Sequence, residues 1–263
     1  MVDYLYHYTN LETLKLILEN KTFRLSSLNK MDDLEEGDTE DFQKLGRFIY
    51  ISSWTNNPVE SLLLWSYSRG NEGVRLRMKS NIFKTTYVNE RVSIHGQSVS
   101  IEENFNDGIL DLMKRENIVF VPPRAELMRV TYTDLNRLLK PTVFKKYPKG
   151  GGFTLETKDL GIFKKVEWQD QQEWRYRLNS MPLNFNELSI INDPKYFDVL
   201  LEKVRTRDEL PYIDLPLKDD AFDGLEILCS PKMSKEGKSE LKLLLEKYAP
   251  NTPIRDSGVR VRV

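Results

Sequence analysis

The sequence predicts an α+β protein that forms one domain over residues 1–263. Segments that alternate apolar and polar residues, as strands do, occur along most of the chain and are mixed with helix-like segments. No internal repeat, low-complexity tract or linker divides the chain. A chain of 263 residues can also bury a substantial core. The simplest architecture is therefore a single α+β domain with a helical insertion at about residues 95–165.

The composition is typical of a globular protein. Hydrophobic residues make up 40% and charged residues 30%, and 39 Lys and Arg oppose 40 Asp and Glu, for a net charge of -1. This balance argues against non-specific binding to nucleic acid or membranes, although a local basic patch stays open. The single cysteine, Cys229, excludes an intramolecular disulfide and a cysteine-rich metal site, and it indicates a reducing compartment.

Neither a membrane span nor a signal peptide is expected. No apolar run approaches the roughly 20 residues that cross a bilayer, and the N-terminus lacks a basic stretch followed by an apolar one. We therefore expect a cytoplasmic protein without a membrane partner.

A histidine lies in the first predicted strand. The aromatic segment Leu5–Asn10 reads as a strand that runs into a helix over Leu11–Glu19, whose apolar residues recur at helical spacing. The end of a strand beside a helix start gathers backbone N–H groups and the positive end of the helix dipole. His7 is therefore either placed to bind a ligand or is a hydrogen-bonded core residue.

Residues 27–37 form a polar, acidic segment after a short predicted strand at 22–26. The carboxylates at positions 32, 33, 35 and 36 lack the Asp-x-Asp-x-Asp-Gly order of a calcium-binding EF-hand. A solvated loop leading into a helix at 38–46 is favoured over a metal site. We predict no metal ligands in the chain.

The most strongly strand-like segment is Phe48–Trp54, which ends in hydroxyl side chains. Ser52 and Ser53 either hydrogen-bond a polar ligand or belong to a turn. A short helix at Val59–Ser68 and an alternating strand at Gly73–Met78 follow. Strand, helix and strand thus form a compact unit.

The other predicted elements depend on weaker patterns. Strands are expected at 87–94, 127–132, 212–215, 222–228, 254–255 and 259–263, and helices at 102–116, 134–140, 142–147, 155–165, 196–204 and 235–248. Gly150–Gly152 reads as a flexible hinge, because the glycine spacing matches neither a phosphate loop nor a dinucleotide-binding fingerprint.

A second informative strand begins at Gln172. Alternation places Glu173, Arg175 and Arg177 on one face and apolar side chains on the other, which is the natural core face. The charged face is either a salt-bridged surface or the lining of a cleft.

Several short motifs occur in an order that resembles a known family. They are Tyr6–Thr9, Leu25–Asn29 followed by acidic residues, Ser52–Trp54, Leu64–Tyr67 with Gly73 and Val74, Trp168 with Glu173–Arg175, and Glu226 and Ile227 with Ser230–Ser234. In this order, across nearly the whole chain, they resemble the bacterial domain-of-unknown-function family 2971. Two departures occur. Asn29–Asp33 stands where that family commonly has Asn-Asp-Pro-x-Glu, and the segment between Trp65 and Gly73 is shortened.

That family is in turn similar to the ADP-ribosyltransferase-like superfamily. The resemblance implies split antiparallel β-sheets with flanking helices, which hold NAD in the cleft between them as the substrate and need no metal. It also implies that Glu173 is the catalytic residue, which stabilises positive charge on the ribose. The residues that it implies for NAD binding are His7, Tyr8, Thr9, Ser52, Ser53, Trp65, Tyr67 and Arg175.

The resemblance also implies roles for individual side chains. His7 would position the ribose through its ring N–H. Tyr67 or Trp65 would stack on the nicotinamide. Arg175 or Arg77 would meet the pyrophosphate. His7 must then share one groove with the catalytic carboxylate, because a single dinucleotide has to touch both.

The expected function is that of an NAD-dependent ADP-ribosyltransferase or NAD glycohydrolase, acting as a toxin or phage-defence effector on a protein or nucleic-acid acceptor. An antitoxin or immunity protein would be a potential partner. Two alternatives stay open. One is a catalytically inactive module of the same fold that binds a nucleotide or a partner, and the other is a metal-dependent nuclease that uses the acidic loop 32–36.

Overall fold

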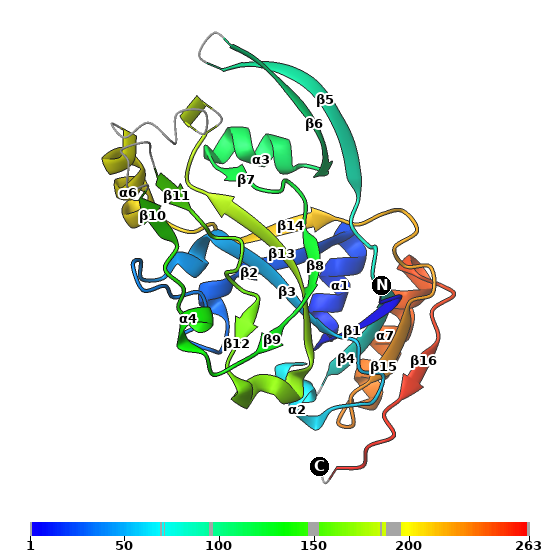
Figure 1. Ribbon diagram of the computed structural model, residues 1–263. Helices are drawn as coiled ribbons and strands as arrows, with labels where there is room; N and C mark the ends of the chain where they lie inside the picture. The colour runs from blue at the N-terminus through cyan, green and yellow to red at the C-terminus, as the bar shows by residue number, and fades with distance from the viewer. Residues whose placement is uncertain are drawn as a thin grey trace.

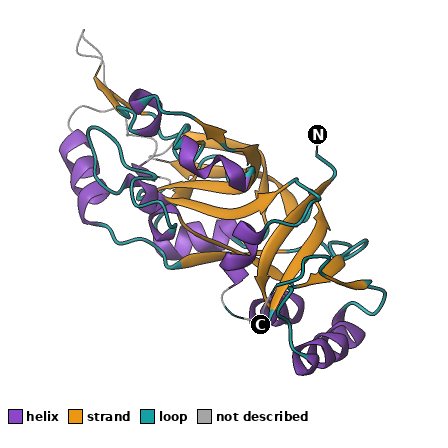
Figure 2. Ribbon diagram, turned by 90° about the horizontal axis from the view of Figure 1, so that it is seen from below, coloured by secondary structure: helices purple, strands orange, loops and turns teal. Residues whose placement is uncertain are grey.

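The computed structural model describes residues 2–68, 70, 72–94, 97–146, 153–184, 186–187 and 196–261. Within these ranges helices and mainly antiparallel strands occur together, which confirms the α+β class. Strands occupy the centre of the molecule and helices lie around them (Figure 2). None of the described helices has the length and apolar character that a membrane crossing requires.

The largest sheet has the strand order β14-β2-β3-β1-β4-β15-β16 (Figure 1). Another strand, β13, pairs with β3 and also with β7 and β8. These strands are β1 (Tyr4–Asn10), β2 (Thr22–Ser27), β3 (Ile49–Thr55), β4 (Gly73–Lys79), β7 (Val119–Phe120), β8 (Glu126–Arg129), β13 (Glu173–Met181), β14 (Tyr212–Pro216), β15 (Glu226–Cys229) and β16 (Ile254–Asp256).

The sheet divides between β1 and β3. These two strands share only the register pair Tyr6↔Thr55, whereas β1 pairs with β4 along its whole length. On the other side, β3 pairs with β13 from Ile49 to Thr55 and with β2 at Ile51 and Tyr50. One part of the sheet therefore contains β1, β4 and β15 and the other contains β2, β3, β13 and β8, and beyond Tyr6 the two parts separate.

Two amphipathic helices lie where the sequence predicts them. Helix α1 (Leu11–Asn20) starts at Asn10, whose side chain accepts a hydrogen bond of 2.8 Å from the backbone N–H of Thr13. Its apolar face is buried and contacts β1 and β2. Helix α7 (Lys235–Tyr248) is capped in the same way by Ser234 and packs against α1. The first helix therefore fixes the end of β1, three residues beyond His7.

The remaining elements are shorter or lie at the periphery. The hairpin of β5 and β6 extends away from the rest of the molecule (Figure 1). These elements are η1 (Leu28–Lys30), η2 (Leu45–Phe48), α2 (Leu62–Trp65), η3 (Ser66–Ser68), β5 (Thr85–Ile94), β6 (Gln97–Asn106), α3 (Ile109–Glu116), β9 (Thr131–Tyr132), α4 (Asn136–Leu139), β10 (Phe144–Lys146), β11 (Phe153–Leu155), β12 (Phe163–Lys164), η4 (Val166–Gln171) and α6 (Phe197–Thr206).

Three predicted helices are wrong because pairing with distant strands or tight turns overrides the local pattern. Residues 142–147 contain β10, and residues 155–165 contain the end of β11 and the whole of β12. Residues 38–46 form turns and the start of η2 instead of an α-helix. The expected helix at 102–116 is half right: its first residues belong to β6, and α3 begins after Gly108, which has a φ of 80°. The region 97–146 and 153–165 is therefore mainly strands and loops, not the helical insertion that we expected.

Smaller corrections concern element ends. The strand expected at 222–228 begins only at Glu226, and the strand expected at 259–263 is absent over 259–261. The helix expected at 134–140 shrinks to α4, and the helix expected at 59–68 becomes α2 followed by η3. The hinge expected at Gly150–Gly152 lies outside the described residues.

Candidate functional site

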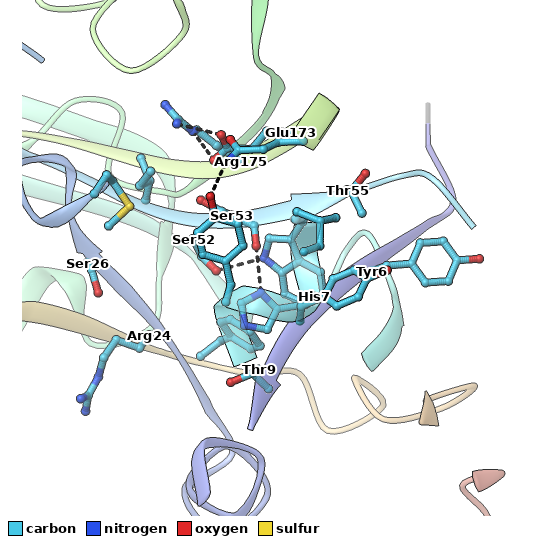
Figure 3. A pocket seen from close by; sticks show the side chains of 18 of the residues that line it. Tyr6, His7, Thr9, Arg24, Ser26, Ser52, Ser53, Thr55, Glu173 and Arg175 are labelled. Atoms are coloured by element: carbon cyan, nitrogen blue, oxygen red, sulfur yellow. Dashed lines mark hydrogen bonds and ion pairs between the residues drawn. The ribbon is translucent and has the colours of Figure 1, made fainter. Parts of the chain in front are cut away.

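A cavity of about 410 Å³ lies where β1 and β3 separate (Figure 3). This volume is in the range of small-molecule sites, which hold about 300–1,000 Å³. Strands β1, β2, β3 and β13 all contribute to its walls, together with α1 and η3. Its lining residues include Tyr6, His7, Tyr8, Thr9, Arg24, Lys30, Ser52, Ser53, Tyr67, Lys164, Gln171, Glu173 and Arg175.

Glu173 and Arg175 form the centre of a buried charge cluster at one wall. The Arg175 Nε donates to Glu173 Oε1 at 2.7 Å, and Nη2 donates to Glu173 Oε2 at 3.0 Å. The remaining N–H groups of Arg175 donate to Glu36 through Nη1 and Nη2 and to the Gly161 carbonyl at 2.8 Å. The Arg175 side chain is 0% exposed and that of Glu36 is 2% exposed. All five N–H donors of Arg175 therefore have acceptors within the protein.

A chain of hydrogen bonds leads from this cluster to Tyr67. The Lys164 Nζ donates to Glu173 Oε2 at 3.3 Å and to Gln171 Oε1 at 2.9 Å, and Gln171 Nε2 donates to the Tyr67 hydroxyl at 2.7 Å. Because Lys164 can only donate, it fixes the orientation of the Gln171 amide. The Tyr67 hydroxyl oxygen is thus an acceptor for Gln171, and among the described residues no acceptor takes its hydrogen, which can be donated to a ligand.

The surroundings of Glu173 keep its carboxylate ionised. Burial would raise the pKa of Glu173, but the positive charges of Arg175 and Lys164, with hydrogen bonds from Arg175 and the Ser53 hydroxyl, lower it to about 2. The backbone of Glu173 is fixed as well, because its N–H donates to the Tyr132 hydroxyl at 2.8 Å. A fixed negative charge therefore lies at the cavity wall at neutral pH.

His7 lies on the other part of the divided sheet. Its Nδ1 is 2.8 Å from the Ser53 carbonyl oxygen, which can only accept, so Nδ1 carries the hydrogen. Burial lowers the pKa of His7 to about 4 in spite of this hydrogen bond, because the rings of Phe23 and Trp54 lie about 5.0 and 4.9 Å away and exclude water from the imidazolium form. His7 is therefore neutral at pH 7, and Nε2 is an acceptor without a partner among the described residues.

The structure brings most of the sequence-predicted site residues to one cavity. Glu173, His7, Tyr8, Thr9, Ser52, Ser53, Tyr67 and Arg175 all line it. Trp65 does not: its ring packs edge-on against Tyr8, and its indole N–H donates to Glu60 at 3.2 Å. Arg77 is also absent from the lining, because it binds Glu226 at 2.6 Å on β15.

Two predicted contacts change with this geometry. Arg175 has no N–H left for a pyrophosphate, so its role in the structure is to hold Glu173 and Glu36. His7 would meet a ligand through the Nε2 lone pair and not through a ring N–H, because its N–H is bound to Ser53. The Ser52 hydroxyl accepts the Trp54 indole N–H at 3.0 Å, which fixes both side chains beside His7.

The charged face of β13 is buried, so the surface-strand alternative for that face is wrong. Relative exposure is 4% for Glu173, 0% for Arg175 and 5% for Arg177. Residues 158–164 and Glu36 cover this face, because Lys164 bonds to Glu173, and Glu36 and the Gly161 carbonyl accept from Arg175. Arg177 donates through Nη1 to the Lys158 and Leu160 carbonyls, and its Nη2 lies 3.7 Å from Glu126, whereas its buried Nε has no partner among the described residues.

The acidic segment also differs from the solvated loop that the sequence predicted. Glu36 turns inward to Arg175, while Glu35 pairs with Lys140 and Lys165 at the surface. Gly37, at a φ of 84°, allows this turn, because its Cα approaches Gly46 too closely for a side chain. No group of three or more His, Cys, Asp or Glu side chains in the described ranges is arranged to hold a metal ion.

Sequence reasoning missed Lys164, Gln171, Glu36, Arg24 and Lys30 as cavity or cluster residues. The only usable signal was the position of Gln171, two residues before Glu173 and within the Trp168–Glu173 motif. The others come from segments whose contacts with distant parts of the chain leave no local pattern in the sequence. No protein-family model, curated protein or solved structure matches the chain. Function has to be inferred from the site itself.

Proposed function

We propose that the protein cleaves NAD between nicotinamide and ribose and transfers the ADP-ribosyl group to an acceptor or to water. The observation that carries this proposal is that an ionised Glu173 and a neutral His7 line one cavity at the division of an antiparallel sheet. This arrangement supports the resemblance to family 2971 and to the ADP-ribosyltransferase-like superfamily. A protein or nucleic acid would be the acceptor, and a toxin or phage-defence role with an antitoxin or immunity partner would follow from such an activity.

The reaction needs a negative charge close to the ribose. When the bond between nicotinamide and C1′ breaks, the electron pair leaves with the nicotinamide ring, which becomes neutral, and positive charge develops at C1′ and the ring oxygen. The Glu173 carboxylate stabilises this charge more than it stabilises bound NAD. An oxygen or nitrogen atom of the acceptor, or the oxygen of water, then bonds to C1′, and the proton of this atom goes to solvent. The low pKa of Glu173 ensures that the carboxylate is charged at neutral pH.

The other cavity residues offer complementary hydrogen bonds. His7 Nε2 accepts from a ribose hydroxyl or from the carboxamide N–H of nicotinamide. The Tyr67 hydroxyl donates its free hydrogen to the ligand, because Gln171 occupies the hydroxyl oxygen as a donor. Burial raises the pKa of Tyr67, which keeps this hydrogen in place. The two groups therefore suit a ligand with both donors and acceptors, as nicotinamide riboside has.

A binding module without catalysis is the second candidate, and one observation favours it. A carboxylate has about four acceptor positions, and those of Glu173 already receive two bonds from Arg175, one from Lys164 and one from Ser53. A carboxylate with these bonds can serve only to hold the surrounding side chains in place. In that case NAD or a related nucleotide binds but is not consumed.

The test is nicotinamide release from NAD by the wild type, Glu173→Gln and His7→Ala, with NAD affinity measured by calorimetry for each. Glu226→Gln is the matched control, because Glu226 also pairs with an arginine, Arg77, but lies outside the cavity. We expect Glu173→Gln to lower turnover by about 100-fold or more, since the charge that stabilises the transition state is lost. His7→Ala should weaken NAD binding, and Glu226→Gln should behave as wild type.

The two candidates give different results in this assay. NAD binding without release of nicotinamide by the wild type would contradict the enzyme and support the binding module. Turnover that survives Glu173→Gln would exclude Glu173 as the catalytic residue. Absence of any NAD binding would contradict both candidates.

A further inference from the structure

Two cations line the cavity away from the buried charge cluster. Arg24 on β2 and Lys30 in η1 have side-chain exposures of 48% and 44%, in contrast to the buried Lys164 and Arg175. Figure 3 places Arg24 and Glu173 well apart, with Ser52 and Ser53 between them. The cavity therefore has the buried Glu173 carboxylate on one side and accessible cations on the other, with Asp32 as a second carboxylate in its lining.

Arg24 is held in a fixed orientation. Its Nε and Nη2 donate to the two carboxylate oxygens of Asp214 at 2.8 Å each, and its guanidinium lies 3.4 Å from the ring centroid of Tyr212. Because neither of the bonds to Asp214 uses Nη1, the N–H groups of Nη1 can be donated to a ligand. A guanidinium that is already ordered loses little conformational freedom when it binds a ligand.

Lys30 is tethered to the residues just before β14, the strand that carries Asp214. Its Nζ donates to the Pro211 carbonyl at 2.9 Å and lies 3.7 Å from Glu209, which leaves two of its N–H donors without hydrogen bonds in the described part of the chain. Pro211 and Asp214 are three residues apart along an extended segment, so the two tethers are about 10 Å apart. One elongated anion can contact both cations.

We infer that Arg24 and Lys30 bind the diphosphate of a dinucleotide whose nicotinamide end lies at Glu173; this inference depends on the proposed function. The nicotinamide ring of NAD is positively charged and its diphosphate is negative. Only one direction of binding places the ring beside the carboxylate and the phosphates beside the cations. A planar guanidinium donates two parallel N–H groups to phosphate oxygens, which makes Arg24 the stronger contact.

The other cations near the cavity are less suited to this role. All five N–H donors of Arg175 have protein acceptors, and Lys164 is bound to Glu173 and Gln171. Arg77 makes the same kind of cluster as Arg24, because it pairs with Glu226 and lies 3.5 Å from the ring centroid of Tyr4, but it does not line the cavity. Arg77 is therefore a matched control for Arg24.

The experiment measures the affinity of ADP-ribose, which has the diphosphate but no nicotinamide, by calorimetry. The proteins are wild type, Arg24→Gln, Lys30→Gln and the control Arg77→Gln. We expect Arg24→Gln to weaken binding about 10-fold or more and Lys30→Gln to weaken it less, because each removes hydrogen bonds to a charged group. Arg77→Gln should bind as wild type. Lys30→Gln keeps the ion pair between Arg24 and Asp214, so it tests the site even if Arg24→Gln is poorly folded.

Nicotinamide riboside, which lacks the diphosphate, is the second probe, and a short RNA is the third. The inference holds if both variants bind ADP-ribose more weakly than wild type does and bind nicotinamide riboside with unchanged affinity. It is overturned if wild type does not bind ADP-ribose, if both variants bind ADP-ribose as wild type does, or if the variants lose affinity for ADP-ribose and nicotinamide riboside equally. It is also overturned if the variants lose affinity for the RNA alone, because the cations would then bind the phosphates of a nucleic-acid acceptor.

NAD turnover by the same proteins separates this inference from the proposed function. If wild type binds ADP-ribose through Arg24 and Lys30 but releases no nicotinamide, the diphosphate site is supported and the proposed enzymatic activity is contradicted. If wild type turns NAD over and both variants have the same KM as wild type, the enzymatic activity is supported and the diphosphate site is contradicted.

Discussion

Arg175 and Arg24 lie on two strands of the same sheet and line the same cavity, yet their surroundings are opposite. Arg175 is 0% exposed, and carboxylates and a carbonyl accept all of its N–H donors. The Arg24 side chain is 48% exposed, and Asp214 accepts only from Nε and Nη2. Burial forces complete pairing on the first, whereas exposure lets the second keep donors for a ligand. Residue type alone therefore does not distinguish a residue that supports a site from one that binds.

The first prediction breaks the Arg175 cluster. Arg175→Ala leaves Glu173 and Glu36 buried, close together and without their main cation, with only Lys164 nearby. We expect the free energy of unfolding, measured by urea denaturation, to fall by about 3–5 kcal/mol. A loss below about 1 kcal/mol would mean that the cluster is hydrated and not buried as described.

Arg24→Ala is the control for that measurement. It also removes an arginine that is bonded to a carboxylate, here that of Asp214 on the neighbouring strand β14, but at the surface. Exposed ion pairs contribute about 0–1 kcal/mol, so the loss should be much smaller than for Arg175→Ala. Equal losses for the two variants would remove the distinction between the two clusters.

The second prediction concerns how the stability that the Arg175 cluster contributes depends on pH. The folded pKa of Glu173 lies near 2, below its ordinary value of 4.5, so the charged form contributes stability that is complete above about pH 4.5. This contribution decreases as pH falls from 4.5 to 2 and amounts to about 3 kcal/mol. Denaturation of wild type between pH 6 and 2.5 should therefore show a steeper loss of stability than denaturation of Glu173→Gln. Parallel curves would contradict the low pKa.

The sequence predicted those parts of the fold that local patterns determine. Helix α7 was predicted with its observed bounds, and α1 ends one residue beyond its predicted end, because capping residues and apolar spacing lie within the segments themselves. Residues 155–165 were predicted as a helix, but β12 pairs in parallel with β9, about 30 residues earlier in the chain. No pattern within such a segment reveals a partner of that kind.

The same limit applies to the site. Alternation correctly placed Glu173 and Arg175 on one face of β13, but it could not tell that residues 158–164 and Glu36 pack on that face and bury it. The acidic loop looked solvated because composition describes an average, and only the fold turns Glu36 toward Arg175. Lys30 carries no motif at all, and its position depends on the contact between η1 and the residue before β14.

The most direct test of the proposed dinucleotide site is a crystal structure of Glu173→Gln soaked with NAD, since that variant should bind NAD without consuming it. We expect the nicotinamide riboside between position 173 and His7 Nε2, and the diphosphate at Arg24 and Lys30. A cavity that remains empty at saturating NAD, or NAD bound elsewhere on the protein, would contradict the proposed site.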